Sequence, residues 1–257
     1  MFDYRGLHDA LFLMLYIGAG VLALLAALYL LLRRRNLFMR EVGSGELLTI
    51  ELPSGRRLRL GHALRSSRRL RRWTAAFLLT AALSHVWWYG VGQWWLAGDP
   101  LVRTLLVIML DHMTLVPLLM GVLLAMLQDR RRPLWPWLLV QVPVAAFGVM
   151  GIMQRSWLNG YTLAHYWQLG TIAVFIVYYI FALRQYGRWL LDNFADLEHK
   201  QVWQSLALAL VFFVIYGLYT SNMGALSREY LSQVLTVAIV AFLVWRAETL
   251  EELEADG

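Results

Sequence analysis

Long apolar runs separated by short polar segments make up most of this chain. The first run, residues 10–32, contains no charged residue and is followed at once by Arg33, Arg34 and Arg35. A helix needs about 20 apolar residues to cross a hydrocarbon core about 30 Å thick, and helices are the default in lipid because unpaired backbone groups are too costly there. The pattern therefore predicts an all-α fold, a polytopic bundle of seven transmembrane helices. Their approximate ranges are 10–32, 74–96, 103–127, 134–153, 163–183, 203–220 and 229–245.

The fourth run is the least regular of the seven. Pro136, Gln141 and Pro143 interrupt it, and a proline inside a helix removes a backbone hydrogen bond and disturbs the preceding turn. The sixth and seventh runs are the shortest.

The distribution of Arg and Lys predicts the orientation of the bundle. Twelve arginines lie between Arg33 and Arg72. With the N-terminus outside the cell, nineteen of the 23 Arg and Lys residues face the cytoplasm and four face outward. Because short loops rich in Arg and Lys stay in the cytoplasm, we expect the N-terminus out and the C-terminus in. The protein would then be a multi-pass protein of the inner (cytoplasmic) membrane, and tryptophans near both ends of the spans fit aromatic belts.

The chain divides into a seven-helix membrane domain, residues 1–246, and a short acidic cytoplasmic tail, residues 247–257. The first cytoplasmic loop, residues 33–73, is long enough to have structure of its own. Apolar and polar residues alternate over 48–52 and over 57–60, with a Pro-Ser-Gly turn signal between them. This pattern is typical of a β-hairpin, in which Glu51 would face an arginine on the other strand.

Composition and charge agree with a membrane protein. The chain is 60% hydrophobic and 16% charged, whereas an ordinary soluble domain is about 45–50% apolar and about 25% charged. The net charge of +6 lies mostly in loops next to the spans. We therefore expect the lipid bilayer as a partner, with anionic headgroups at the Arg33–Arg72 loop, and no direct binding of nucleic acid. The absence of cysteine excludes disulfides and thiolate chemistry.

Ionisable and polar side chains inside the expected spans are the candidates for function, because each is costly in lipid. Most of them would lie in the outer half of the bundle. The candidate ligand-binding residues are His85, Trp88, Asp111, His112, His165 and Gln168.

Three interpretations of this set remain open. The first is a ligand pocket in the outer half of the bundle. The second is a metal or haem site formed by His85, His112 and His165, since imidazole binds several transition metals, although no His-x-x-x-His pair is present. The third is structural, with Asp111 and the histidines hydrogen-bonding across helices. We favour the first and third equally and expect no metal or cofactor. Neighbouring helix residues point about 100° apart, so Asp111 and His112 should face different partners.

Enzyme signatures are absent from the sequence. No G-x-S-x-G, H-E-x-x-H or P-loop motif occurs, and we expect a protein that is not an enzyme. A covalent retinal protein is excluded because the one lysine, Lys200, falls in a predicted cytoplasmic loop. Matched broken helices, the sequence sign of a carrier site, are also missing.

Five segments carry a resemblance to a known family. They are RLRRWTAAF (69–77), LSHVWW (83–88), AHYWQLG (164–170), YGRWLLDNFADLEHKQVW (186–203) and LVWRAETLEELE (243–254). Together they resemble the membrane half of Bacteroidetes regulators in which a multi-span sensor precedes a cytoplasmic AraC-type helix-turn-helix domain. The resemblance implies a sensing module, with dimerisation through the bundle if the output is dimeric. No helix-turn-helix pattern is present in these residues, so DNA binding is not carried over, and the long first loop has no counterpart in the family.

These features predict an integral membrane sensor or receptor-like module that is not an enzyme. It would relay an outer-side or intramembrane signal to a cytoplasmic output, in the manner of membrane-bound regulators of transcription, by shifting a helix-packing equilibrium. The alternative is a small-solute or ion transporter that uses the polar residues in the outer half of the bundle.

Overall fold

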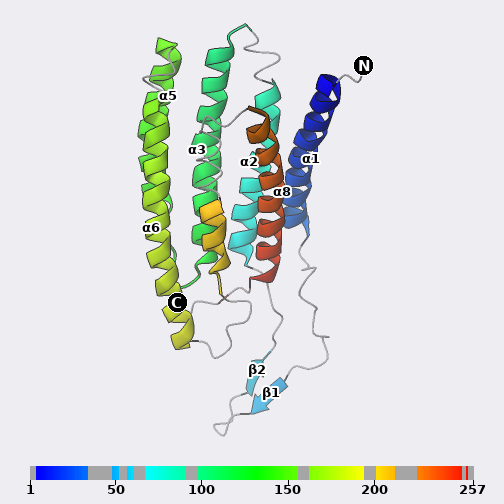
Figure 1. Ribbon diagram of the computed structural model, residues 1–257. Coiled ribbons are helices and arrows are strands. Elements are labelled where there is room, and N and C mark those ends of the chain that lie inside the picture. The colour runs from blue at the N-terminus through cyan, green and yellow to red at the C-terminus, as the bar shows by residue number, and fades with distance from the viewer. Residues whose placement is uncertain are drawn as a thin grey trace.

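The protein folds as a bundle of helices whose axes run side by side (Figure 1). The computed structural model describes residues 4–33, 48–51, 57–60, 67–90, 98–155, 162–193, 201–211, 225–250 and 253. The helices are α1 (Tyr4–Leu32), α2 (Arg68–Gly90), α3 (Pro100–Met126), α4 (Trp135–Val140), α5 (Val142–Gln154), α6 (Thr162–Asn193) and α8 (Ala225–Thr249). Residues 204–211 are also helical.

Five stretches of these helices are long and apolar enough to cross a bilayer. They are Ala10–Leu32, Leu105–Met126, Trp135–Gln154, Thr162–Asn193 and Tyr230–Thr249. The predicted all-α membrane bundle is therefore confirmed in this coarser form. The α2 helix, which occupies most of the predicted second span, is long enough but is not among the five, and residues 212–220 of the predicted sixth span lie outside the described part of the chain.

The polar α2 helix lies in the middle of the bundle. It contacts α1, α3 and α8, while α5 lies between α3 and α6. The helices α1, α3, α6 and α8 end, and α2 begins, at one end of the bundle, the lower end in Figure 1. Arg33, Arg71, Arg132 and Arg246 lie at these helix ends, and we call this the basic end.

Small side chains lie on the buried face of α1, which contacts α2 and α8. Ala19, Ala23 and Ala27 are buried, whereas leucines on the other faces of α1 are exposed, Leu25 to 59%. This arrangement suits a helix in lipid, because leucine gains nothing by leaving lipid while small residues let two helices approach closely. At Gly20 the approach is so close that an added Cβ would lie 3.1 Å from Cγ of His85.

Local sequence explains where the helices start and break. Asp99 caps α3 by accepting a hydrogen bond from the backbone N–H of Val102 (3.2 Å), and Pro100 occupies its first turn. The predicted irregularity of the fourth span is confirmed, since the helix breaks at Gln141 into α4 and α5. Near the break, the indole N–H of Trp167 on α6 donates to the carbonyl of Val140 (2.9 Å).

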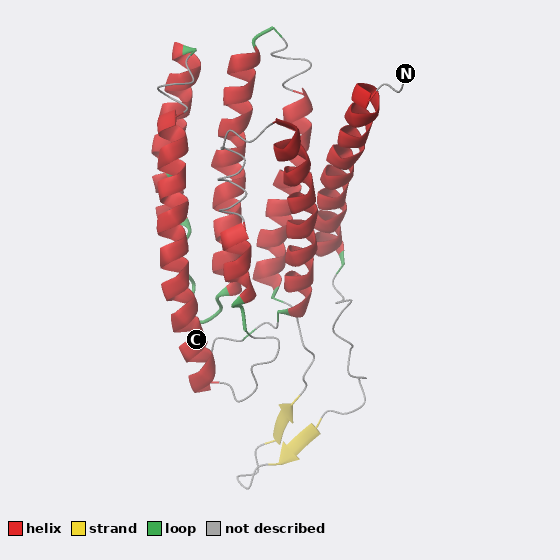
Figure 2. Cartoon of the chain, in the orientation of Figure 1, coloured by secondary structure: helices red, strands yellow, loops and turns green. Residues whose placement is uncertain are grey.

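The first long loop contains the antiparallel hairpin β1 (Leu48–Glu51) and β2 (Arg57–Leu60) (Figure 2). Its register pairs Glu51 with Arg57 and Leu48 with Leu60, so the acidic residue faces an arginine as the alternation predicted. Because α1 ends and α2 begins at the basic end, the hairpin is attached to that end of the bundle.

Two glycines of the bundle should respond differently to substitution by alanine. A Cβ at Gly121 would lie 2.6 Å from two ring carbons of Trp73, whereas a Cβ at Gly148 would meet the thioether end of the Met109 side chain at 2.7 Å. A ring wedged between helices cannot move aside as a methionine can. We expect Gly121→Ala to lower the free energy of unfolding by about 2 kcal/mol and Gly148→Ala to lower it clearly less. Unfolding in mixed micelles measures both, and equal losses would contradict the packing described here.

Candidate functional site

Polar side chains from four helices meet around the last two turns of α2. This group, the polar cluster, consists of Tyr16 on α1, Ser84, His85 and Trp87 on α2, Asp111 on α3 and Gln233 on α8. It is more than a helix-to-helix contact, because it joins α2 to each of the three helices that surround it.

Asp111 is held between two donors from α2. Its Oδ1 atom accepts hydrogen bonds from the Ser84 hydroxyl (2.7 Å) and from the Trp87 indole N–H (3.0 Å). Ser84 and Trp87 are three positions apart and so lie on one face of the helix. A carboxylate that accepts two such bonds is stabilised in its charged form, which makes it tolerable among apolar side chains.

His85 connects α2 to α1 and α8. Tyr16 donates its hydroxyl hydrogen to the His85 backbone carbonyl (2.8 Å), and its ring lies 4.7 Å from the imidazole, centroid to centroid. The imidazole Nδ1 lies 2.7 Å from the Ala81 carbonyl and Nε2 lies 3.2 Å from Oε1 of Gln233.

These contacts link the number of protons on the His85 ring to the orientation of the Gln233 amide. A carbonyl oxygen only accepts, so Nδ1 carries a hydrogen and donates it to Ala81. Because Oε1 of Gln233 is also an acceptor, a bond from Nε2 to this oxygen requires a second proton on the ring. A neutral ring would instead accept from the amide nitrogen of Gln233 after the amide had turned over. Protonation of His85 and the orientation of the Gln233 amide are therefore linked.

His112 and His165 lie apart from this cluster and share a small cavity. His112 is buried on α3, and the cavity beside it is also lined by His165 and Ala164 of α6 and Gly148 of α5. Its volume of about 20 Å³ is enough for one water molecule. As expected from their spacing, Asp111 faces α2 while His112 faces α5 and α6.

The other two candidates are Gln168, which belongs to neither the polar cluster nor the cavity, and Trp88. Gln168 on α6 is 0% exposed, and neither its amide oxygen nor its amide nitrogen has a hydrogen-bond partner among the residues that the structure describes. The Trp88 side chain lies outside the described residues. The predicted set is therefore not one site: His85 and Asp111 belong to the polar cluster, His112 and His165 to the cavity, and Gln168 to neither.

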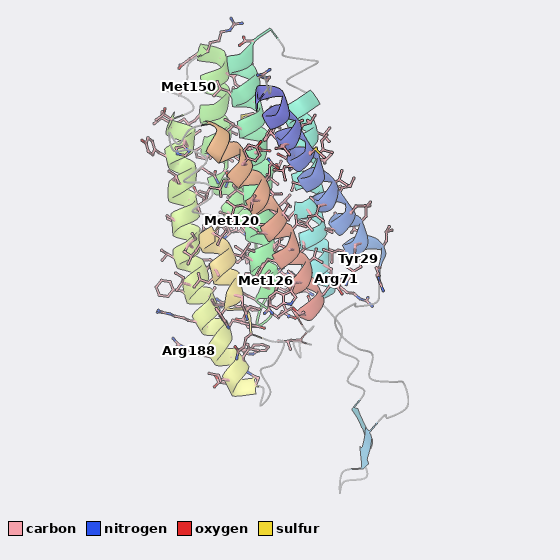
Figure 3. All side chains as sticks on the ribbon, turned by 45° about the vertical axis from the view of Figure 1, so that its right-hand side comes forward. Tyr29, Arg71, Met120, Met126, Met150 and Arg188 are labelled. Carbon is pink, nitrogen blue, oxygen red and sulfur yellow. The ribbon has the colours of Figure 1, made fainter. Side chains whose placement is uncertain are left out.

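A buried ion pair at the basic end was not predicted. Arg71 on α2 donates through Nη1 to Oε1 of Glu248 on α8, which is 0% exposed. Its Nη2 atom donates to the backbone carbonyls of Leu30 (3.2 Å) and Arg33 at the end of α1. Those carbonyls have no partner within their own helix, so one guanidinium joins three helices (Figure 3, where Arg71 is labelled).

Further hydrogen bonds connect the helices at the basic end. The Ser67 hydroxyl, just before α2, accepts a hydrogen bond from the backbone N–H of Leu70 in the first turn of that helix (3.4 Å). The backbone N–H of Ser67 donates to the carbonyl of Leu250, just after α8 (3.4 Å). The Leu253 N–H donates to the Gln128 side chain beyond α3 (2.8 Å). The end of α8 is thereby attached to α2 and to the segment after α3.

Sequence patterns identified the ionisable members of the polar cluster but not its geometry. Ser84 and Tyr16 carry no signal of their own, Gln233 stands out only as a polar residue within a predicted span, and Trp87 also fits an aromatic belt. Among the described residues, no three His, Asp or Glu side chains lie close enough together to hold a metal ion. Comparison of the chain with protein-family models, curated proteins and solved structures found no match.

Proposed function

We propose that this chain is an integral membrane sensor module that is not an enzyme. It has seven spans, with its N-terminus outside and its C-terminus in the cytoplasm of an inner membrane. It relays an outer-side or intramembrane signal to a cytoplasmic output. The resemblance of its membrane segments to AraC-type membrane regulators points the same way.

One observation supports this proposal above the others: α2 and α8 are joined at two levels by polar contacts. His85 contacts Gln233, and Arg71 is paired with Glu248. Along α2 the two contacts are 14 residues apart and along α8 they are 15 apart, which is about 21 Å at 1.5 Å per residue. Because the spacings match on two antiparallel helices, a displacement of α8 at the polar cluster carries through to the basic end.

The signal would act by favouring one arrangement of this helix pair. Protonation of His85, or a ligand that competes for Gln233, changes the hydrogen bonds available at the polar cluster. The response at the basic end can be no larger than the free-energy difference that the signal makes between the two arrangements. The basic loop and the acidic segment after α8 are then the surfaces that a cytoplasmic partner would read, with anionic headgroups as the other contact of the loop.

A distance measurement across α2 and α8 tests the proposal. The chain has no cysteine, so Arg72→Cys on α2 and Ala241→Cys on α8, both at exposed positions, can carry a pair of spin labels. We expect His85→Ala to shift the distribution of distances between the labels, because it removes the contact with Gln233 at the far level of the same two helices.

Trp167→Phe provides the matched control. It removes a hydrogen bond to Val140 between α6 and α4, outside the α2–α8 pair, and should leave the distribution unchanged. If His85→Ala has no more effect than this control, the two levels are not coupled and the sensor mechanism fails.

A small-solute or ion transporter is the second candidate. It is supported by the half-buried, titratable side chains of Asp111 and His85 within one intramembrane cluster, since such side chains serve as proton relays in pumps and carriers. Proton flux into liposomes loaded with a pH-sensitive dye tests it. Flux that depends on the protein and is abolished by Asp111→Asn would replace the sensor proposal with the transporter.

A further inference from the structure

Arg246 is a buried charge that has no counter-ion among the described residues. It lies in the last turn of α8 and is 3% exposed. Its Nε and Nη2 atoms have no hydrogen-bond partner, and no ion pair involves it among the described residues. Arg71, at the same end of the bundle, is also buried but has Glu248 and two backbone carbonyls as partners.

In the described part of the chain, the neighbours of Arg246 are aromatic rings, and no carboxylate is paired with it. Its guanidinium carbon lies 5.8 Å from the ring centroid of Trp245. It also lies near Tyr179 and Tyr186 of α6. The Tyr179 hydroxyl is already hydrogen-bonded to Ser205 (2.6 Å). The rings and the negative end of the α8 dipole favour a cation here, but they leave the free N–H groups without acceptors.

A second buried arginine lies near the same tyrosines. Arg132 is 4% exposed and donates to Asp129 through both Nη atoms, while its Nε atom has no partner within the described ranges. It lies near Tyr179, as Arg246 does. Both guanidinium groups thus lie near Tyr179, and the carboxylate beside Arg132, that of Asp129, is already paired with it among the described residues.

Positive charge is in excess across this part of the basic end. Burial lowers the pKa of Arg69, and the neighbouring charges of Arg131 and Arg132 lower it further. An arginine beside like charges is stabilised by any anion that comes close. The region therefore attracts negative charge, and Arg246 holds the N–H groups that are free to bind it.

We propose that Arg246, together with Nε of Arg132, binds a phosphate group between α6, α8 and the segment after α3. Phosphate oxygens match the planar fork of a guanidinium and accept two parallel hydrogen bonds from it. Basic pockets between transmembrane helices are sites at which anionic lipid headgroups bind. The phosphate can come from such a headgroup or from free phosphate. The proposal does not depend on the sensor function.

Thermal unfolding of the full chain in a neutral detergent tests the site. The three probes are inorganic phosphate, short-chain phosphatidylglycerol and short-chain phosphatidylcholine, all at one ionic strength. We expect one of the two anionic probes to raise Tm saturably, by on the order of 5 °C at about 100 times its Kd. Whichever probe does so identifies the source, and phosphatidylcholine, which has no net charge, should not.

Three variants separate a site from general charge attraction. Arg246→Gln should abolish the Tm shift, and without a probe its Tm should not fall, because it removes an unpaired buried charge. Arg131→Gln, which removes one charge from an exposed neighbour of Arg132, should keep the shift. Arg246→Lys keeps the charge but loses the planar guanidinium donors, so it should show a smaller Tm shift. If Arg246→Gln does not fold, the comparison of Arg246→Lys with the wild type replaces it.

Several outcomes would overturn the proposal. One is an equal shift in the wild type and Arg246→Gln, and another is an equal loss of the shift in Arg131→Gln. The third is no shift with any probe, which would mean that water alone completes the hydrogen bonds of Arg246.

Discussion

Replacing Glu248 with alanine should lower the free energy of unfolding by about 3–5 kcal/mol. The carboxylate is completely buried and is the counter-ion of Arg71, whose own side chain is also buried. Removing it leaves the guanidinium charge of Arg71 without its buried counter-ion, beside the carbonyls of Leu30 and Arg33. Reversible unfolding in mixed micelles or bicelles measures the loss.

Two controls show whether the loss comes from the unpaired charge. The double variant Arg71→Met, Glu248→Leu should recover most of the stability, because buried ion pairs can often be replaced by apolar residues at little cost. Arg155→Ala removes a pair with Asp99 that is 3.6 Å long and largely exposed, and should change stability by less than about 1 kcal/mol. A double variant no more stable than Glu248→Ala would contradict this account of the pair.

Asp111→Ala should be the second most damaging of these changes, with a loss of about 3 kcal/mol. It takes the acceptor away from two donors at once, the Ser84 hydroxyl and the Trp87 indole N–H. An unsatisfied buried donor costs about 1–3 kcal/mol. Tryptophan emission should also shift on substitution, because the Trp87 indole loses a charged partner.

Asp111→Asn is the matched comparison. It keeps an oxygen in nearly the same place and removes the charge, so we expect it to cost about 1 kcal/mol. That difference makes it the right variant for the proton-flux experiment, because it stays folded while losing its titratable group. If alanine and asparagine are equally costly, the two hydrogen bonds to Asp111 do not contribute to stability as described.

The helices were predictable because lipid imposes a simple rule on the sequence. A run such as residues 10–32 has few alternatives to a helix once water is absent, and the proline residues around Gln141 mark the break between α4 and α5 directly. The hairpin was predictable because alternation and a turn signal occur together. The α2 helix shows the limit of the rule, since its polar side chains make it the least lipid-like of the long helices and its place in the middle of the bundle depends on packing.

The site was less predictable because contacts between helices depend on how each helix is rotated about its axis. Asp111 and His85 stand out in an apolar run, but nothing local says that Ser84 or Gln233 completes the hydrogen bonds. Arg71 and Glu248 are harder still, since both adjoin loops, where charges are expected for orientation alone. Their pairing joins residues 177 positions apart, and no pattern in either segment points to the other.

That separation also bears on how the protein is assembled. Chains are synthesised from the N-terminus, so α1 and α2 reach the membrane before α8 has been translated. During that interval Arg71 can meet the carbonyls at the end of α1 but not Glu248. The ion pair therefore forms late in biogenesis, and only a chain whose last helix has arrived neutralises the charge that its second helix brought in.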